Sequence, residues 1–145
     1  MKSSALAVLT ICTLVGSGAL AKDKPKQDVI WPADAIKWEA GPLPGTKLAT
    51  LWGDPKKGGN FGMLVKFDAG VMHPLHHHTH NLKLTIITGT LIHKTESGAE
   101  SKVGPGSYLM QAGGNKHISG CMAGAECQFL VVSDGKFDFI DATKK

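Results

Sequence analysis

Residues 70–89 read GVMHPLHHHTHNLKLTIITG, which joins a dense histidine run to a strand-like alternation of apolar and polar side chains. Leu82, Leu84 and Ile86 fall on one face of an extended segment, and Lys83 and Thr85 fall on the other. A strand with one apolar face packs that face on a core and leaves the other in solvent. This stretch therefore predicts a β-strand with Leu82 pointing inward and Lys83 pointing outward.

Short apolar or alternating segments recur along the rest of the chain, separated by turns rich in Gly, Pro, Asp and Asn. They cover residues 48–52, 61–67, 82–93, 107–111, 116–121, 127–133 and 137–140. Only residues 32–39 could form a turn or two of helix, because no segment keeps a helical period. We expect a single all-β domain, a sandwich or barrel, over residues 29–145, preceded by a mobile polar segment at 22–28.

Length and charge exclude some classes of function. The chain has 145 residues, enough for one domain and too few for two independent cores. The formal net charge is only +4, and every one of the 16 basic side chains is Lys. Arg is the preferred side chain for phosphate and guanine recognition. We therefore expect no nucleic-acid partner.

The first 21 residues have the pattern of a secretory signal peptide. Lys2 precedes an apolar run at residues 5–15, and Ala19-Leu20-Ala21 is a small-x-small cleavage site. The sequence predicts cleavage after Ala21, a periplasmic or secreted location, and no stable membrane insertion afterwards. A retained membrane anchor is the alternative, although the run is short for a bilayer.

The histidine run is typical of a metal site. Five of the seven histidines lie within residues 73–80. Residues two apart on a strand point the same way, so His76 and His78 can both face the interior and bind one ion. A third ligand must come from another strand, and His117 is the remote candidate.

Two patterns of glycine and histidine spacing resemble the two sequence motifs of the cupin superfamily. The first is made up of Gly70, His76, His78 and Gly89. The second is made up of Gly106, Ala112, Gly114 and His117. Three further segments resemble small secreted bacterial single-domain cupins of unassigned function: WPADAIKW at 31–38, LWGDP at 51–55 and DGKFDF at 134–139.

The resemblance covers roughly residues 29–141. It implies a single cupin domain, a double-stranded β-helix or jelly-roll barrel, with a divalent metal held by His76, His78 and His117. It also implies a small-molecule ligand and a possible homodimer. It does not fix the reaction, because one fold hosts many chemistries.

The sequence departs from the cupin pattern at the position of a metal-binding carboxylate. The first motif normally has a Glu where Leu82 or Lys83 stands, and no acidic residue lies between Asp68 and Glu96. The ion would then keep three neutral imidazoles and its full +2 charge, which favours an anionic ligand from solution. Resemblance to three-His cupin dioxygenases favours Fe(II), and Zn, Mn, Ni or Cu are alternatives.

The other histidines are open to different interpretations. His80 has the same parity as His78 and could replace the absent Glu, or lie in solvent in a turn. His73 lies in a loop near the motif and could act as an acid or base at the cavity mouth. We expect His77 and His93 at the surface.

Cys121 and Cys127 flank a predicted turn. An oxidising compartment permits a disulfide between them. The alternative is a pair of small buried apolar side chains.

These features favour a secreted metalloenzyme acting on a small anionic or chelating substrate, by dioxygenase-like or lyase/isomerase chemistry. The alternatives are a non-catalytic small-molecule or metal-binding module, and a metal-holding protein that uses the histidine run itself.

Overall fold

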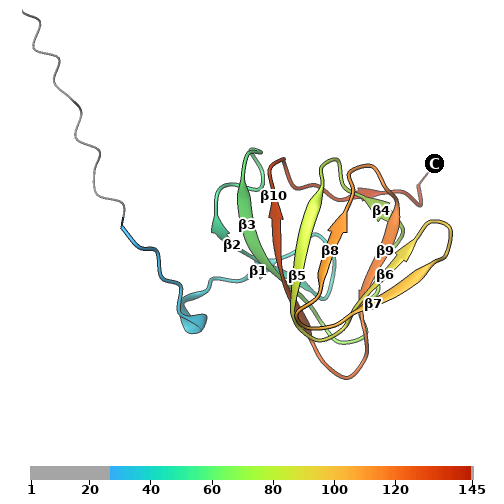
Figure 1. The fold of residues 1–145 in the computed structure, drawn as a ribbon, viewed down its shortest axis with the longest axis horizontal. Coiled ribbons are helices and arrows are strands. Elements are labelled where there is room, and N and C mark those ends of the chain that lie inside the picture. Colours follow the sequence, from blue (N-terminus) through green and yellow to red (C-terminus); the bar gives the residue numbers. More distant parts are fainter. Residues whose placement is uncertain (1–26, 145) are drawn as a thin grey trace, which may run out of the picture. The chain divides into compact units, whose positions relative to one another are not determined.

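The computed structural model describes residues 27–144. The predicted signal peptide at 1–21 lies outside the described residues, as does most of the predicted mobile segment at 22–28. Within the described part, two antiparallel sheets face each other (Figure 1). A short 3-10 helix, η1 (Ala33–Ala35), lies inside the region where the sequence predicts a helical turn. None of the helices in the described part is long and apolar enough to span a membrane.

The larger sheet has six strands in the order β1-β2-β3-β10-β5-β8. Their bounds are β1 Glu39–Ala40, β2 Thr46–Trp52, β3 Phe61–Phe67, β5 Leu82–Thr88, β8 Tyr108–Gln111 and β10 Cys127–Ser133. The smaller sheet has five strands in the order β11-β4-β9-β6-β7. Their bounds are β4 His76–His77, β6 Leu91–Thr95, β7 Glu100–Val103, β9 His117–Cys121 and β11 Ile140–Asp141.

The alternation seen in the sequence sets which side chains enter the core. Leu82, Leu84 and Ile86 on β5 are each 2% exposed, whereas Lys83 is exposed. Phe129 and Val131 on the neighbouring β10 are also buried, on the same side of the sheet. The prediction for β5 is confirmed, and the core lies between the two sheets.

Several segments differ from the expected strands. Residues 82–93 form two strands, because Gly89, with φ of 70°, turns the chain between β5 and β6. Strand β7 was not expected, since it is a mostly exposed edge strand without an apolar face. Most of residues 137–140 form no strand, and this segment instead places two phenylalanines against histidines, as described below.

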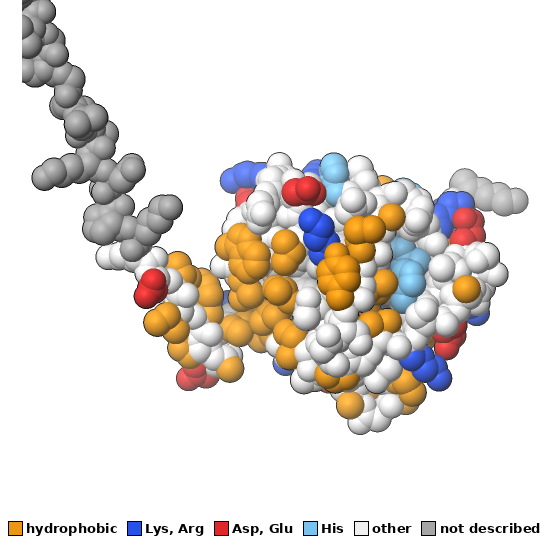
Figure 2. All heavy atoms as spheres, viewed as in Figure 1, with side chains coloured by type: hydrophobic (Ala, Val, Ile, Leu, Met, Phe, Trp, Pro, Cys, Tyr) orange, Lys and Arg blue, Asp and Glu red, His pale blue; other side chains and the backbone are white. Residues whose placement is uncertain are grey.

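The prediction of an all-β jelly roll is confirmed, although the two sheets are not closed into a barrel. Within residues 27–144 the two sheets share no strand ladder, so they form an open jelly-roll sandwich. On one side, β8 ends the larger sheet, and polar side chains line a cleft that reaches from β8 to β6 and β9. Figure 2 shows histidine atoms at the surface beside β9 and β6 on this face.

Candidate metal centre

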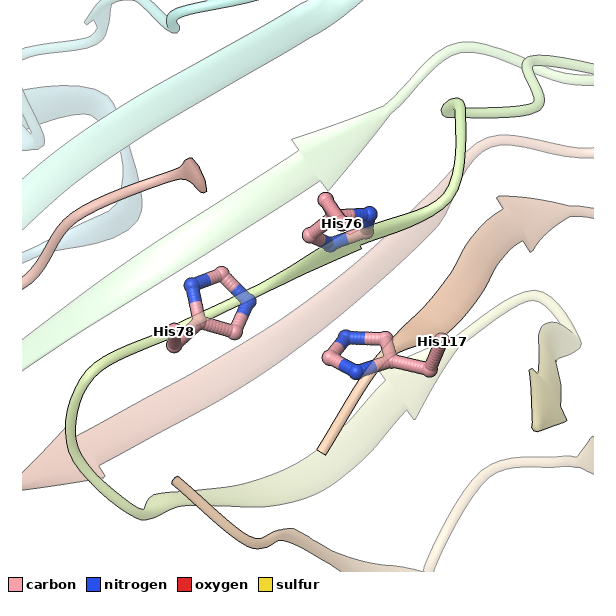
Figure 3. Close-up of side chains that lie close together, drawn as sticks. All are labelled: His76, His78 and His117. Atoms are coloured by element: carbon pink, nitrogen blue, oxygen red, sulfur yellow. The ribbon is translucent and has the colours of Figure 1, made fainter. Parts of the chain in front are cut away.

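Three histidines from two distant segments converge between the sheets. His76 lies on β4, His78 follows that strand by one residue, and His117 opens β9. His76 and His117 are paired in register on neighbouring strands, so their side chains point to the same side (Figure 3). One ring nitrogen from each residue lies within 4.8 Å of the other two. The structure therefore brings together the three residues predicted as ligands.

Hydrogen bonds fix which nitrogen of each ring carries the proton. The Nδ1 atom of His76 donates to the Pro74 carbonyl at 2.8 Å, and Nδ1 of His117 donates to the Asn115 carbonyl at 2.9 Å. The Nδ1 atom of His78 donates to the Asp138 carbonyl at 2.5 Å. A carbonyl can only accept, so each neutral ring is left with its Nε2 lone pair free. This is how imidazoles are oriented for a metal ion in proteins.

Burial keeps these imidazoles neutral. His76 and His117 are each 2% exposed. Desolvation by burial lowers the pKa of His76 to about 3 and that of His117 to about 4, and it also lowers the pKa of His78. Neutral imidazole is the form that binds a metal.

The donor set fits a single divalent ion. The Nε2 atom of His117 is buried and has no hydrogen-bond partner among residues 27–144, an arrangement that costs free energy unless something binds there. Three imidazole nitrogens bonded to one ion at about 2.1 Å lie about 3.0–3.4 Å from one another in octahedral or tetrahedral geometry. The nitrogens are already within 4.8 Å of one another, so a movement of about 1 Å by each ring would close the site.

The C-terminal segment braces two of the rings, which sequence reasoning did not foresee. The Phe139 ring stacks on His76 with centroids 4.3 Å apart, and Phe137 stacks on His78 at 5.6 Å. Between them, the Asp138 carboxylate accepts hydrogen bonds from the backbone N–H and the hydroxyl of Thr79. The segment at residues 137–139 therefore fixes the position of the loop that carries His78.

The remaining histidines fall in different places from those expected. His80 is exposed, its ring lies against Gly135, and the structure does not bring it to the three-His group. His73 is 8% exposed and hydrogen-bonds through Nε2 to the Thr46 hydroxyl at 2.9 Å, so it belongs to the cavity wall and not to an open mouth. His77 is only partly exposed.

His93 corrects the expectation of a surface position. It is half-buried, its ring centroid lies 5.0 Å from that of His117, and its buried Nδ1 has no hydrogen-bond partner in the described part of the chain. The alternation of side chains along the strand could have indicated this position. His93 lies two residues after Leu91 and therefore on the same strand face, and Leu91 is fully buried.

Two spaces adjoin the three-His group. An inner cavity of about 50 Å³ is lined by His76 and His78, and Leu82 lies in the same wall. A more open cleft of about 450 Å³ is lined by His117 and His93. Gln111, which is buried, lines both spaces.

Cys121 and Cys127 are joined by a disulfide in the structure. It links the end of β9 to the start of β10 across a short turn, and thus ties the smaller sheet to the larger one.

Comparison with solved structures shows the cupin fold. The polyketide cyclase RemF from Streptomyces resistomycificus is similar with a TM-score of 0.70 and 19% identity, over 82% of this chain and 88% of that chain. An RmlC-like cupin protein from Ralstonia eutropha gives 0.64 and 17%, over 82% and 76%. The DMSP lyase DddQ from Ruegeria pomeroyi gives 0.62 and 16%, over 83% and 73%.

No curated protein matches the sequence. A family model described as "Domain of unknown function (DUF4437)" matches residues 17–140, which is most of the chain. The protein therefore has a cupin fold and belongs to the DUF4437 family.

Proposed function

We propose that this protein binds one divalent metal ion through the Nε2 atoms of His76, His78 and His117 and acts on a small organic molecule that coordinates that ion. The observation that carries the proposal is the common tautomer of the three buried rings. All three donate Nδ1–H to a backbone carbonyl, and all three therefore present a lone pair toward their neighbours.

The chain's own residues prepare the site for such an ion. Burial holds the imidazoles neutral, so no proton has to leave when the ion binds near pH 7. Leu82, which is 2% exposed, lines the cavity without offering a ligand atom. A bound divalent ion would supply Lewis acidity toward oxygen atoms of the ligand and, if it is Fe(II), the capacity for O₂ chemistry.

The cavity wall also favours a second candidate, a non-catalytic binding module. Among the residues that line the inner cavity, all of them in the described part, none is Lys, Asp or Glu. A general acid or base there would have to be a histidine, and the remaining lining histidine, His73, is bonded to Thr46. Turnover over a substrate panel separates an enzyme from a binder.

We further propose that the protein is exported and that residues 1–21 are removed, on the strength of the N-terminal sequence pattern. Intact mass and N-terminal sequencing of protein from a periplasmic fraction test this. The expected N-terminus is Lys22, and a chain that retains residues 1–21 in the membrane fraction would contradict it.

Metal analysis of untagged protein tests the metal site. We expect one ion per chain, lost in His76→Ala and in His117→Ala. His77→Ala is the matched control, since His77 is adjacent on β4 and lies outside the three-His group. It should retain the ion. Equal loss in all three variants, or several loosely bound ions per chain, would favour the whole histidine run at residues 73–80 as the binding element and overturn the proposal.

A further inference from the structure

The inner cavity carries information about the ligand that the three histidines alone do not. Beyond the three-His group, most of its wall is aliphatic or aromatic, including Val65, Leu84, Phe129 and Val131. No charged side chain of residues 27–144 lines it. A charged group pushed into this space would lose its hydration and find no counter-charge.

The polar side chains in the wall are already bonded to each other. His73 is hydrogen-bonded to Thr46 at 2.9 Å, and the Gln111 amide donates to the Ser119 hydroxyl at 3.2 Å. All four residues are buried. Within the described residues, the wall therefore offers an incoming group apolar contact and two polar pairs that are already hydrogen-bonded, and it offers no charged partner.

The outer cleft differs in charge from the inner cavity. Lys116 and Glu96 line it and form an ion pair at 3.0 Å. The three-His group lies where the two spaces approach each other, because His76 and His78 line the inner one and His117 lines the outer one. A ligand bound at the ion thus has a polar side and an apolar side available to it.

We infer that the ligand class is a molecule with one metal-binding, anionic head and an uncharged apolar tail, with the tail seated in the inner cavity. This inference rests on the proposed metal site. The cavity is small, about 50 Å³, which limits the tail to a few carbon atoms. Ligands that carry a second charge at the far end are excluded from this seat.

Two isosteric probes test the inference. Pentanoate and 4-aminobutanoate have the same head and the same number of heavy atoms, and they differ in a terminal methyl against a terminal ammonium. The purified protein is loaded with Co²⁺, its ion content is measured, and each probe is titrated at pH 7.5 while the visible spectrum of the bound ion is recorded. Acetate serves as the head without a tail.

We expect pentanoate to bind at least about tenfold more tightly than acetate, since each buried methylene is worth roughly a fourfold gain. We expect 4-aminobutanoate to bind at least about tenfold more weakly than pentanoate, because its ammonium would be buried unpaired. Equal affinities for pentanoate and 4-aminobutanoate would overturn the inference.

A variant pair locates the tail. Val131→Phe fills the inner cavity and should abolish the advantage of pentanoate over acetate, with Co²⁺ content unchanged. Thr85→Phe adds the same ring on the exposed face of β5 and should preserve that advantage. If Val131→Phe fails to fold, the comparison of probes on the unmodified protein still decides the question. Failure to load Co²⁺ would refute the proposed metal site itself. The ion content is measured before any probe is added, so this failure is distinguished from failure of the probes to bind.

Discussion

Replacing Leu82 by Glu tests whether an aliphatic side chain stands where a fourth ligand could reach the ion. Leu82 is 2% exposed, lines the cavity with His76 and His78, and pairs with Gln111 across the ladder. A carboxylate there would share the cavity with the imidazoles. In the absence of metal, the substitution should cost stability. Losing the burial of the leucine costs about 1.5–3 kcal/mol. Burying a polar group costs about 1–3 kcal/mol more.

In the presence of metal, the same carboxylate should stabilise the bound ion. A buried interaction with a charged partner is worth about 1.5–3 kcal/mol, which corresponds to roughly a 10- to 150-fold lower Kd for the ion. Leu82→Gln is the matched control, since the Gln side chain has nearly the same shape as that of Glu but carries no charge. Isothermal titration with Co²⁺ gives the two Kd values, and thermal melts with and without Co²⁺ give the two stabilities.

We therefore expect Leu82→Glu to be less stable than the natural protein in the absence of metal. We also expect Co²⁺ to raise the stability of Leu82→Glu more than that of Leu82→Gln. If the Glu and Gln variants bind Co²⁺ with the same Kd, the side chain at position 82 does not reach the ion. The assignment of Leu82 to the absent carboxylate position would then be wrong.

Three further outcomes follow from the fold. Replacing Cys121 and Cys127 together by Ala should lower the free energy of unfolding by about 2 kcal/mol, from the loop entropy of a crosslink six residues apart, as measured by urea denaturation. Metal-free protein should lose stability as the pH falls from about 6.5 toward 3, because burial lowers the pKa of His76 to about 3 while the unfolded chain takes up the proton near 6.5; unchanged urea midpoints at pH 7 and pH 5 would refute this. Gly89→Ala should cost about 2–4 kcal/mol, since φ is 70° and the new Cβ would lie 2.6 Å from the Glu126 carbonyl oxygen; Gly104→Ala, with open space around it, should be neutral in the same melts.

Much of the fold could be predicted because alternation encodes which face of a strand is buried. The burial of Leu82, Leu84 and Ile86 follows directly from their spacing. Strand β7 could not be predicted in this way, because an edge strand that faces solvent is not constrained to alternate. The sequence left a sandwich and a barrel both open, because alternation within a strand does not say whether the edge strands of two sheets pair with each other.

The three predicted ligands come together, but what orients them could not be deduced from the sequence. The acceptors for their Nδ1 protons are the backbone carbonyls of Pro74, Asn115 and Asp138, and every residue has a carbonyl. Only the folded backbone decides which carbonyl meets which ring. The stacking of Phe139 on His76 is equally a product of the fold, since 63 positions separate them in the chain.

No carboxylate of residues 27–144 lines the inner cavity, and this links the metal to the ligand. Three neutral imidazoles leave the ion's +2 charge uncompensated in a buried site, so an anionic head from solution stabilises the ion there. By linkage, whatever factor an anion adds to metal affinity, the metal adds to anion affinity. Leu82→Glu would supply that negative charge from the protein. The same variant that tightens Co²⁺ binding should therefore weaken pentanoate binding. The Glu carboxylate would already offset part of the ion's charge, so the ion would attract a second anion less strongly. If metal affinity and anion affinity rose together in that variant, charge compensation would not be what couples them.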